Sequence, residues 1–135
     1  MTLQDVRVDV KVKLAALWTS VMFLYIYADW FGLFVPGALQ KMLAGNMAPL
    51  GPVTQTMLLG TSLMMAIPSV MIFLSVGLPA RASRTLNLIF GVVYTLIILI
   101  TMWGGWFFYI FYGVLEVALT LLVVWCAWKW PRTNA

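Results

Sequence analysis

The chain has 135 residues, of which 64% are hydrophobic and only 9% are charged, and its net charge is +4. Soluble domains average about 45–50% apolar and about 25% charged residues, so a water-soluble fold of this size could not bury so much apolar side chain. The sequence has no histidine and one cysteine, Cys126, which excludes an intrachain disulfide and argues against haem, most zinc and copper sites and histidine-dependent nucleophiles. We therefore expect an integral membrane protein that is not an enzyme and has no metal site and no cofactor.

Four apolar runs are long enough to cross a bilayer, which takes roughly 17–25 helical residues. In chain order they are residues 14–34, 57–78, 86–103 and 106–128. The first run is too long for the apolar core of a signal peptide, and we interpret it as a retained helix. The sequence thus predicts an all-α membrane protein whose single domain, residues 1–135, has four transmembrane helices.

The basic residues are unevenly distributed between the loops. All but one of the eight lie before the first run, between the second and third runs, or after the fourth, namely Arg7, Lys11, Lys13, Arg81, Arg84, Lys129 and Arg132. Because lysine and arginine are enriched on the cytoplasmic side, this distribution predicts that both termini are cytoplasmic, and we expect a multi-pass protein of a bacterial inner membrane. The positive charge therefore indicates topology in a lipid bilayer, and we expect no nucleic acid partner.

The loops differ in length. Residues 79–85 link the second and third runs, and Gly104-Gly105 links the third and fourth, so short connections predict an up-down-up-down bundle. The first loop, residues 35–56, is longer. Within it, residues 36–44 are compatible with a short interfacial helix ended by Gly45, and an irregular loop is the alternative.

Two carboxylic acids, Asp29 and Glu116, lie well inside the apolar runs. A charged side chain costs roughly 2.5–3.5 kcal/mol near a helix centre, so an intramembrane acid is a functional-site hypothesis by default. At about 1.5 Å per residue, Asp29 lies about 8 Å from the outer end of the first helix, and Glu116 lies about 15 Å from the outer end of the fourth. Each acid follows a tyrosine by four residues, Tyr25 and Tyr112, and residues so spaced share a helix face.

The first and fourth helices run in opposite directions, so we expect Tyr25 at the level of Glu116 and Tyr112 at the level of Asp29. If these helices touch, two crossed tyrosine–carboxyl pairs would form a polar cluster in the outer half of the bundle. Two further tyrosines, on the third and fourth helices, extend the cluster. The predicted ligand- or proton-binding site therefore comprises Asp29, Glu116, Tyr25, Tyr112, Tyr94 and Tyr109.

This cluster has more than one interpretation. A carboxyl group in a low-dielectric site can exchange a proton for a cationic or polar ligand, so the leading function is binding or transport of a small ligand, cation or proton. In the structural alternative, both acids stay protonated or bonded to tyrosine hydroxyls and hold the helices together. The runner-up function is a non-catalytic structural or accessory subunit that contacts another membrane protein or a second copy of the chain.

Other polar residues of the runs point to packing. We interpret five hydroxyl side chains as helix-packing groups rather than ligands: Thr61, Ser62, Ser69, Ser75 and Thr95. The nine methionines suit a pliable core and are too scattered to indicate a copper site.

The stretch from Leu17-Trp18 through Tyr25-Ile26-Tyr27-Ala28-Asp29 to Gly32-Leu33 and Pro36-Gly37 resembles the opening of an uncharacterised family of small bacterial four-helix membrane proteins. The resemblance covers most of the chain and implies fold and topology only, because that domain of unknown function has no assigned role. The helix count also resembles the DoxX-like group, without a shared motif. Small multidrug-resistance transporters are similar in size and place an acid in the first helix, but their surrounding motif is missing here, so that likeness is architectural.

Overall fold

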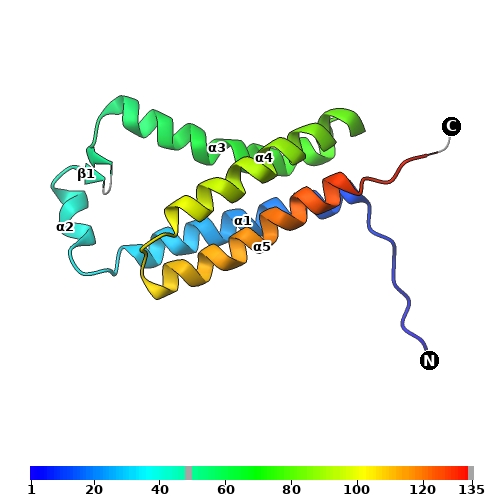
Figure 1. Ribbon diagram of the computed structural model, residues 1–135, viewed down its shortest axis with the longest axis horizontal. Helices are drawn as coiled ribbons and strands as arrows, with labels where there is room; N and C mark the ends of the chain where they lie inside the picture. The colour runs from blue at the N-terminus through cyan, green and yellow to red at the C-terminus, as the bar shows by residue number, and fades with distance from the viewer. Residues whose placement is uncertain (48–49, 134–135) are drawn as a thin grey trace.

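The computed structural model describes residues 1–47 and 50–133 and contains five α-helices within them (Figure 1). Four of these helices are long and apolar enough to cross a membrane, which confirms the predicted all-α, four-helix membrane fold. Large apolar side chains such as Phe73 and Ile100 are exposed on the outside of the bundle, as a lipid environment requires. The helices are α1 (Val10–Gly32), α2 (Ala38–Leu43), α3 (Gln55–Gly77), α4 (Ala80–Thr101) and α5 (Phe107–Trp128).

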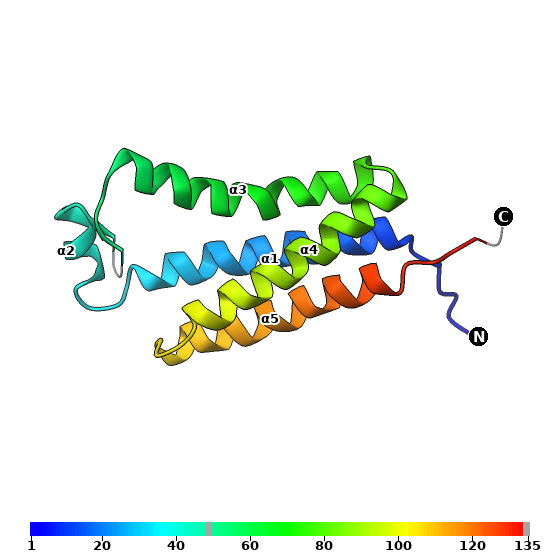
Figure 2. The same ribbon diagram turned by 45° about the horizontal axis from the view of Figure 1, so that its top comes forward.

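The long helices alternate in direction, so the first and last described residues lie at one end of the bundle, which we call the terminal end (Figure 1). The opposite end, which we call the loop end, carries α2. Helix α1 packs against α3 and α5, and α4 packs along α5, whereas α3 and α4 contact each other much less. Figure 2 shows α4 close to α3 at the terminal end and close to α5 at the loop end. Helices α3 and α4 therefore diverge toward the loop end.

Helix α1 begins earlier than predicted, at Val10 rather than residue 14, so Lys11 and Lys13 lie within the helix and do not precede it. Asp9 caps the helix by accepting a hydrogen bond from the Lys11 amide at 2.8 Å. The apolar run underestimates the helix because charged side chains of the first turn can reach water while the backbone stays helical.

The short links were also predicted incorrectly. Helix α4 begins at Ala80, so most of the predicted loop 79–85 is helical and only two residues separate α3 from α4. Conversely, the turn between α4 and α5 spans residues 102–106 and not only a glycine pair. Within this turn Gly104 has a φ of 71°, a left-handed conformation that favours glycine.

The long loop between α1 and α3 has structure of its own. Of the two alternatives for residues 36–44, the helix is observed, in the shorter form of α2. After it, β1 (Asn46–Met47) pairs antiparallel with β2 (Gly51–Pro52). This hairpin was not predicted, because strands of two residues leave no alternating pattern in a sequence.

A hydrogen-bonded network occupies the core toward the terminal end. Trp18 Nε1 donates to Asn87 Oδ1 at 2.7 Å, and Asn87 Nδ2 donates to the carbonyl of Ser83 at 2.8 Å and to Ser75 Oγ at 3.2 Å. The Ser83 hydroxyl donates to the carbonyl of Ser75 at 2.9 Å. All four side chains are 0% exposed. We call these residues the Asn87 network; it ties α1, α3 and α4 together.

At the terminal end, two basic side chains donate hydrogen bonds to carbonyl groups near helix C-termini. Lys11 Nζ donates to the carbonyl of Leu78, directly after α3, at 2.7 Å, and Arg84 Nε donates to the carbonyl of Ala127, in the last turn of α5, at 3.0 Å. Carbonyl groups at a helix C-terminus have no partner within the helix, so these cations satisfy them. The terminal end is therefore tightly joined.

Candidate functional site

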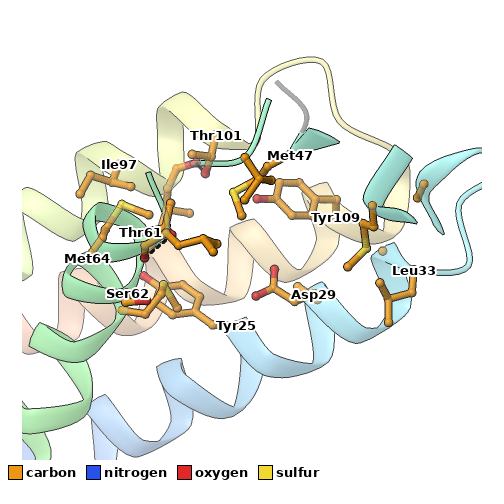
Figure 3. A pocket seen from close by; sticks show the side chains of 18 of the residues that line it. Tyr25, Asp29, Leu33, Met47, Thr61, Ser62, Met64, Ile97, Thr101 and Tyr109 are labelled. Atoms are coloured by element: carbon orange, nitrogen blue, oxygen red, sulfur yellow. Dashed lines mark hydrogen bonds between the residues drawn. The ribbon is translucent and has the colours of Figure 1, made fainter. Parts of the chain in front are cut away.

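A cavity of about 880 Å³ lies in the loop-end half of the bundle, lined by all five helices (Figure 3). Five of the six predicted site residues line it: Asp29, Glu116, Tyr25, Tyr94 and Tyr109. The apolar part of the lining includes four methionines, Met42, Met47, Met64 and Met65. The cavity therefore combines carboxyl and phenol groups with a flexible apolar surface.

Helix α1 contributes two polar side chains that are one turn apart. Figure 3 shows Tyr25 and Asp29 projecting from α1 into the cavity. The Tyr25 hydroxyl is buried and has no hydrogen-bond partner among the described residues. A buried hydroxyl without a partner is costly, so this group indicates an unfilled interaction.

Helix α5 contributes Glu116, which is 6% exposed. It lies about 14 Å along α5 from Phe107, well inside the span. Within residues 1–47 and 50–133, no hydrogen bond or ion pair engages the carboxyl of Glu116 or that of Asp29. Both acids thus line one cavity without a partner in the described chain, Glu116 as a buried side chain and Asp29 as an exposed one.

Tyr94 has a structural task although it lines the cavity. Its hydroxyl donates to the carbonyl of Met64 in α3. That carbonyl would normally accept from the amide four residues later, but the residue there is Pro68, which has no N–H. Tyr94 therefore replaces the helix hydrogen bond that the proline removes. Its ring also packs edge-on against Trp18, with centroids 6.1 Å apart.

Tyr112 does not line the cavity. Its ring stacks on Phe31 of α1, with centroids 6.4 Å apart and planes 19° apart, and Phe31 lies two residues from Asp29 on another side of α1. The predicted pair of Tyr112 with Asp29 therefore does not form. At about 100° per residue, Tyr109 falls about 20° to one side of Glu116 around the helix axis and Tyr112 about 40° to the other, so the rotation of α5 against α1 decides which of them enters the cavity. The other predicted pair, Tyr25 and Glu116, lines the cavity without a hydrogen bond between the two side chains.

Sequence reasoning missed one charged residue of the lining, Lys41, which α2 places there with an exposed side chain. Its signal was present, since it is the only basic residue of the long loop, but the loop's path over the cavity is a tertiary feature. Among the predicted packing hydroxyls, Thr61 and Ser62 line the cavity. Thr61 Oγ1 donates to the backbone carbonyl of Met57 at 3.1 Å, so its proton is already engaged.

The remaining predicted packing hydroxyls bond within the bundle. Ser69 and Ser75 donate to carbonyls of their own helix at 2.9 and 2.7 Å, and Thr95 Oγ1 lies 2.7 Å from Thr120 Oγ1 of α5. In the part of the chain that the structure describes, no group of three or more acidic, cysteine or histidine side chains could hold a metal ion.

Comparison with known proteins gives one match. The sequence profile of a family of unknown function (DUF6326) covers residues 1–135. No curated protein and no solved structure shows significant similarity to the chain. The resemblance to an uncharacterised family is thus confirmed, and the DoxX-like resemblance is not supported by a match. The chain belongs to the DUF6326 family.

Proposed function

We propose that this member of the family binds a small ligand, cation or proton at the cavity lined by Asp29, Glu116 and Tyr25, and that it transports what it binds. One observation carries the proposal: two carboxyl groups and an unpartnered tyrosine hydroxyl surround one cavity within the membrane span. Ionisable groups are expensive at this depth and typically mark ion, proton or substrate pathways. Acids that only held helices together would be expected to have partners. The proposed role is not enzymatic.

The packing favours a carrier rather than an open pore. Toward the terminal end, the space between the helices is filled by completely buried side chains, among them Leu14, Trp18, Met71 and Val123. A ligand at Glu116 therefore has no path through the terminal end, and release at that end needs a rearrangement. Alternating access of this kind is typical of transporters that bind near the midplane.

The proposed orientation places both termini in the cytoplasm of a bacterium, with the protein in the inner membrane and the cavity open to the outside. The seven basic residues near the terminal end support it. A cytoplasmic reporter enzyme fused after the last residue should be active, and the same reporter inserted within α2 should be inactive. Activity of the α2 insertion would reverse the orientation.

Binding can be tested on the purified protein in lipid nanodiscs. A ligand that binds only the folded state adds RT ln(1 + [L]/Kd) to stability, about 2.7 kcal/mol at a hundredfold excess over Kd. Thermal unfolding is measured with sodium, potassium and alkylammonium salts from acidic to alkaline pH. Because a cation binds the deprotonated carboxyl, its stabilising effect should grow as the pH rises, and Glu116→Gln should abolish it.

The matched control is Tyr112→Phe, which removes a hydroxyl outside the cavity and should leave the cation effect unchanged. If no cation, amine or lipophilic compound stabilises the protein at any pH, the proposal is wrong. Co-purification of a fixed membrane-protein partner in that case would favour the accessory-subunit alternative.

A further inference from the structure

The cavity has a polar side and an apolar side, supplied by different elements. Helices α1 and α5 contribute both carboxyl groups and two phenols, Tyr25 and Tyr109. The four methionines come from α2, β1 and α3, which also contribute four polar side chains to the lining, Lys41, Asn46, Thr61 and Ser62. Figure 3 shows Tyr25 and Asp29 on α1 and Met64 and Met47 on other elements around the same space. A ligand whose polar group lies against the acids of α1 and α5 can therefore place an apolar part along the methionines.

The polar side has the composition of an ammonium site. The carboxyl of Asp29, the carboxyl of Glu116 and the hydroxyl oxygen of Tyr25 are acceptors with no partner among the described residues. A primary ammonium has three N–H donors, one for each of these acceptors. The described cation that lines the cavity is Lys41, and with both carboxyls ionised the lining stays net negative. Tyrosine faces add attraction for a cation.

The apolar side and the size argue against an inorganic cation. A volume of about 880 Å³ far exceeds what a metal ion with a few waters occupies, and it falls within the range of about 300–1,000 Å³ typical of pockets for organic ligands. Methionine side chains adapt to apolar chains of varied shape. Because α3 and α4 diverge beside the cavity, where Met64 and Ile97 line it, an amphiphile could also enter from the lipid.

We infer that the ligand is a primary amine with an apolar chain, bound as its ammonium: the nitrogen donates to Asp29, Glu116 and Tyr25, and the chain lies along the methionines. This inference rests on the proposed function and specifies its ligand class. We expect that neither the ammonium group nor the apolar chain of the ligand suffices alone. A neutral alcohol would leave the carboxyls unpaired, and a short amine would leave the methionines without contacts.

Four probes separate the contributions of the apolar chain, the positive charge and the N–H donors to binding: octylamine, propylamine, octanol and octyltrimethylammonium. Thermal unfolding is measured in nanodiscs for the native sequence and for Glu116→Gln, and the difference removes the effect of amphiphiles that partition into the bilayer. Octylamine should bind at least about tenfold more tightly than propylamine, because each buried methylene group adds affinity. Octanol should show no Glu116-dependent effect. Octyltrimethylammonium, which has no N–H donor, should bind more weakly than octylamine.

A second pair of variants keeps the test valid if Glu116→Gln does not fold. Tyr25→Phe removes a hydroxyl that has no partner to lose, so it should fold and should weaken octylamine binding several-fold. Tyr112→Phe should not change octylamine binding. Equal effects of the two substitutions would overturn the assignment of Tyr25 to the ammonium site.

The outcomes distinguish this inference from the function on which it rests. Equal affinity for propylamine and octylamine would overturn the apolar-chain inference and leave a small-cation binder. Equal affinity for octylamine and its trimethylated analogue would overturn the three-donor head group. If no probe of any length gives a stabilisation that depends on Glu116 or Tyr25, the inference is wrong, and the proposed function is wrong as well only if the sodium, potassium and alkylammonium salts also have no effect.

Discussion

The two ends of the bundle treat buried polar side chains in opposite ways. In the Asn87 network near the terminal end, Trp18, Ser75, Ser83 and Asn87 are fully buried and bonded to one another or to the backbone. In the cavity near the loop end, the buried side chain of Glu116 and the buried Tyr25 hydroxyl have no such partners in the described chain, and Asp29 is exposed. A buried polar group is inexpensive only when bonded. The contrast shows that this chain can supply hydrogen-bond partners to polar side chains in its core. The polar groups without partners at the loop end therefore need a different explanation.

Chain connectivity accounts for where the bundle is tight. Only Leu78 and Pro79 separate α3 from α4, so these two helices must stay together at the terminal end. At the loop end, α1 and α3 are joined by a long segment that contains α2 and the hairpin. Close approach of α4 and α5 further depends on Gly91, where a Cβ would lie 2.7 Å from Val124 Cγ2. At the loop end, α3 therefore has no short link to a neighbouring helix, and it diverges from α4 there.

The largest change in stability is expected for the Asn87 network at the terminal end. Asn87→Leu should lower the free energy of unfolding by about 2–3 kcal/mol, because it leaves the Trp18 N–H and the Ser83 carbonyl with one partner fewer in a dry core. Denaturant unfolding in detergent measures it. The control is Ser20→Ala, which removes an exposed hydroxyl that donates only to the Ala16 carbonyl of its own helix and should change stability by no more than about 0.5 kcal/mol. Equal effects of the two substitutions would remove the distinction between the two ends.

A smaller loss of stability is expected for Tyr94, which lines the cavity but whose hydroxyl also holds the fold together. Tyr94→Phe should cost about 1–2 kcal/mol, because the Met64 carbonyl then has no donor. Pro68→Ala restores an amide for that carbonyl, so the cost of Tyr94→Phe should fall to nearly zero in that background. A double-mutant cycle by thermal unfolding measures the coupling. Additive effects would contradict the assignment.

The smallest effect is expected at the acids themselves. Glu116→Gln should change the free energy of unfolding by less than about 1 kcal/mol, because the carboxyl has no partner to lose. The same unfolding assay, without added ligand, checks it. A loss of more than about 2 kcal/mol would show that the carboxyl holds the fold together and would favour the structural alternative.

Much of the fold could be predicted because its determinants are local. Apolar length alone identifies the four spans, since each helix meets lipid rather than a particular partner. The cost of an acid in hydrocarbon singles out Asp29 and Glu116, and the spacing of four residues places Tyr25 on the face of Asp29, as observed. The starts of α1 and α4 were missed by several residues, because their polar first turns carry no apolar signal.

Other features depend on how the helices meet. Helix periodicity places both Tyr109 and Tyr112 near the face of Glu116, but only the rotation of α5 against α1 turns Tyr109 into the cavity and Tyr112 onto Phe31. Lys41 joins the lining because α2 lies against it, and Asn87 finds Trp18 because α1 and α4 meet there. The sequence by itself determined the number of the spans and the acids within them, since these follow from the transfer of single helices into lipid. The tertiary structure alone decided which of those side chains share a cavity, because rotation, tilt and divergence of the helices arise from all their packing contacts together.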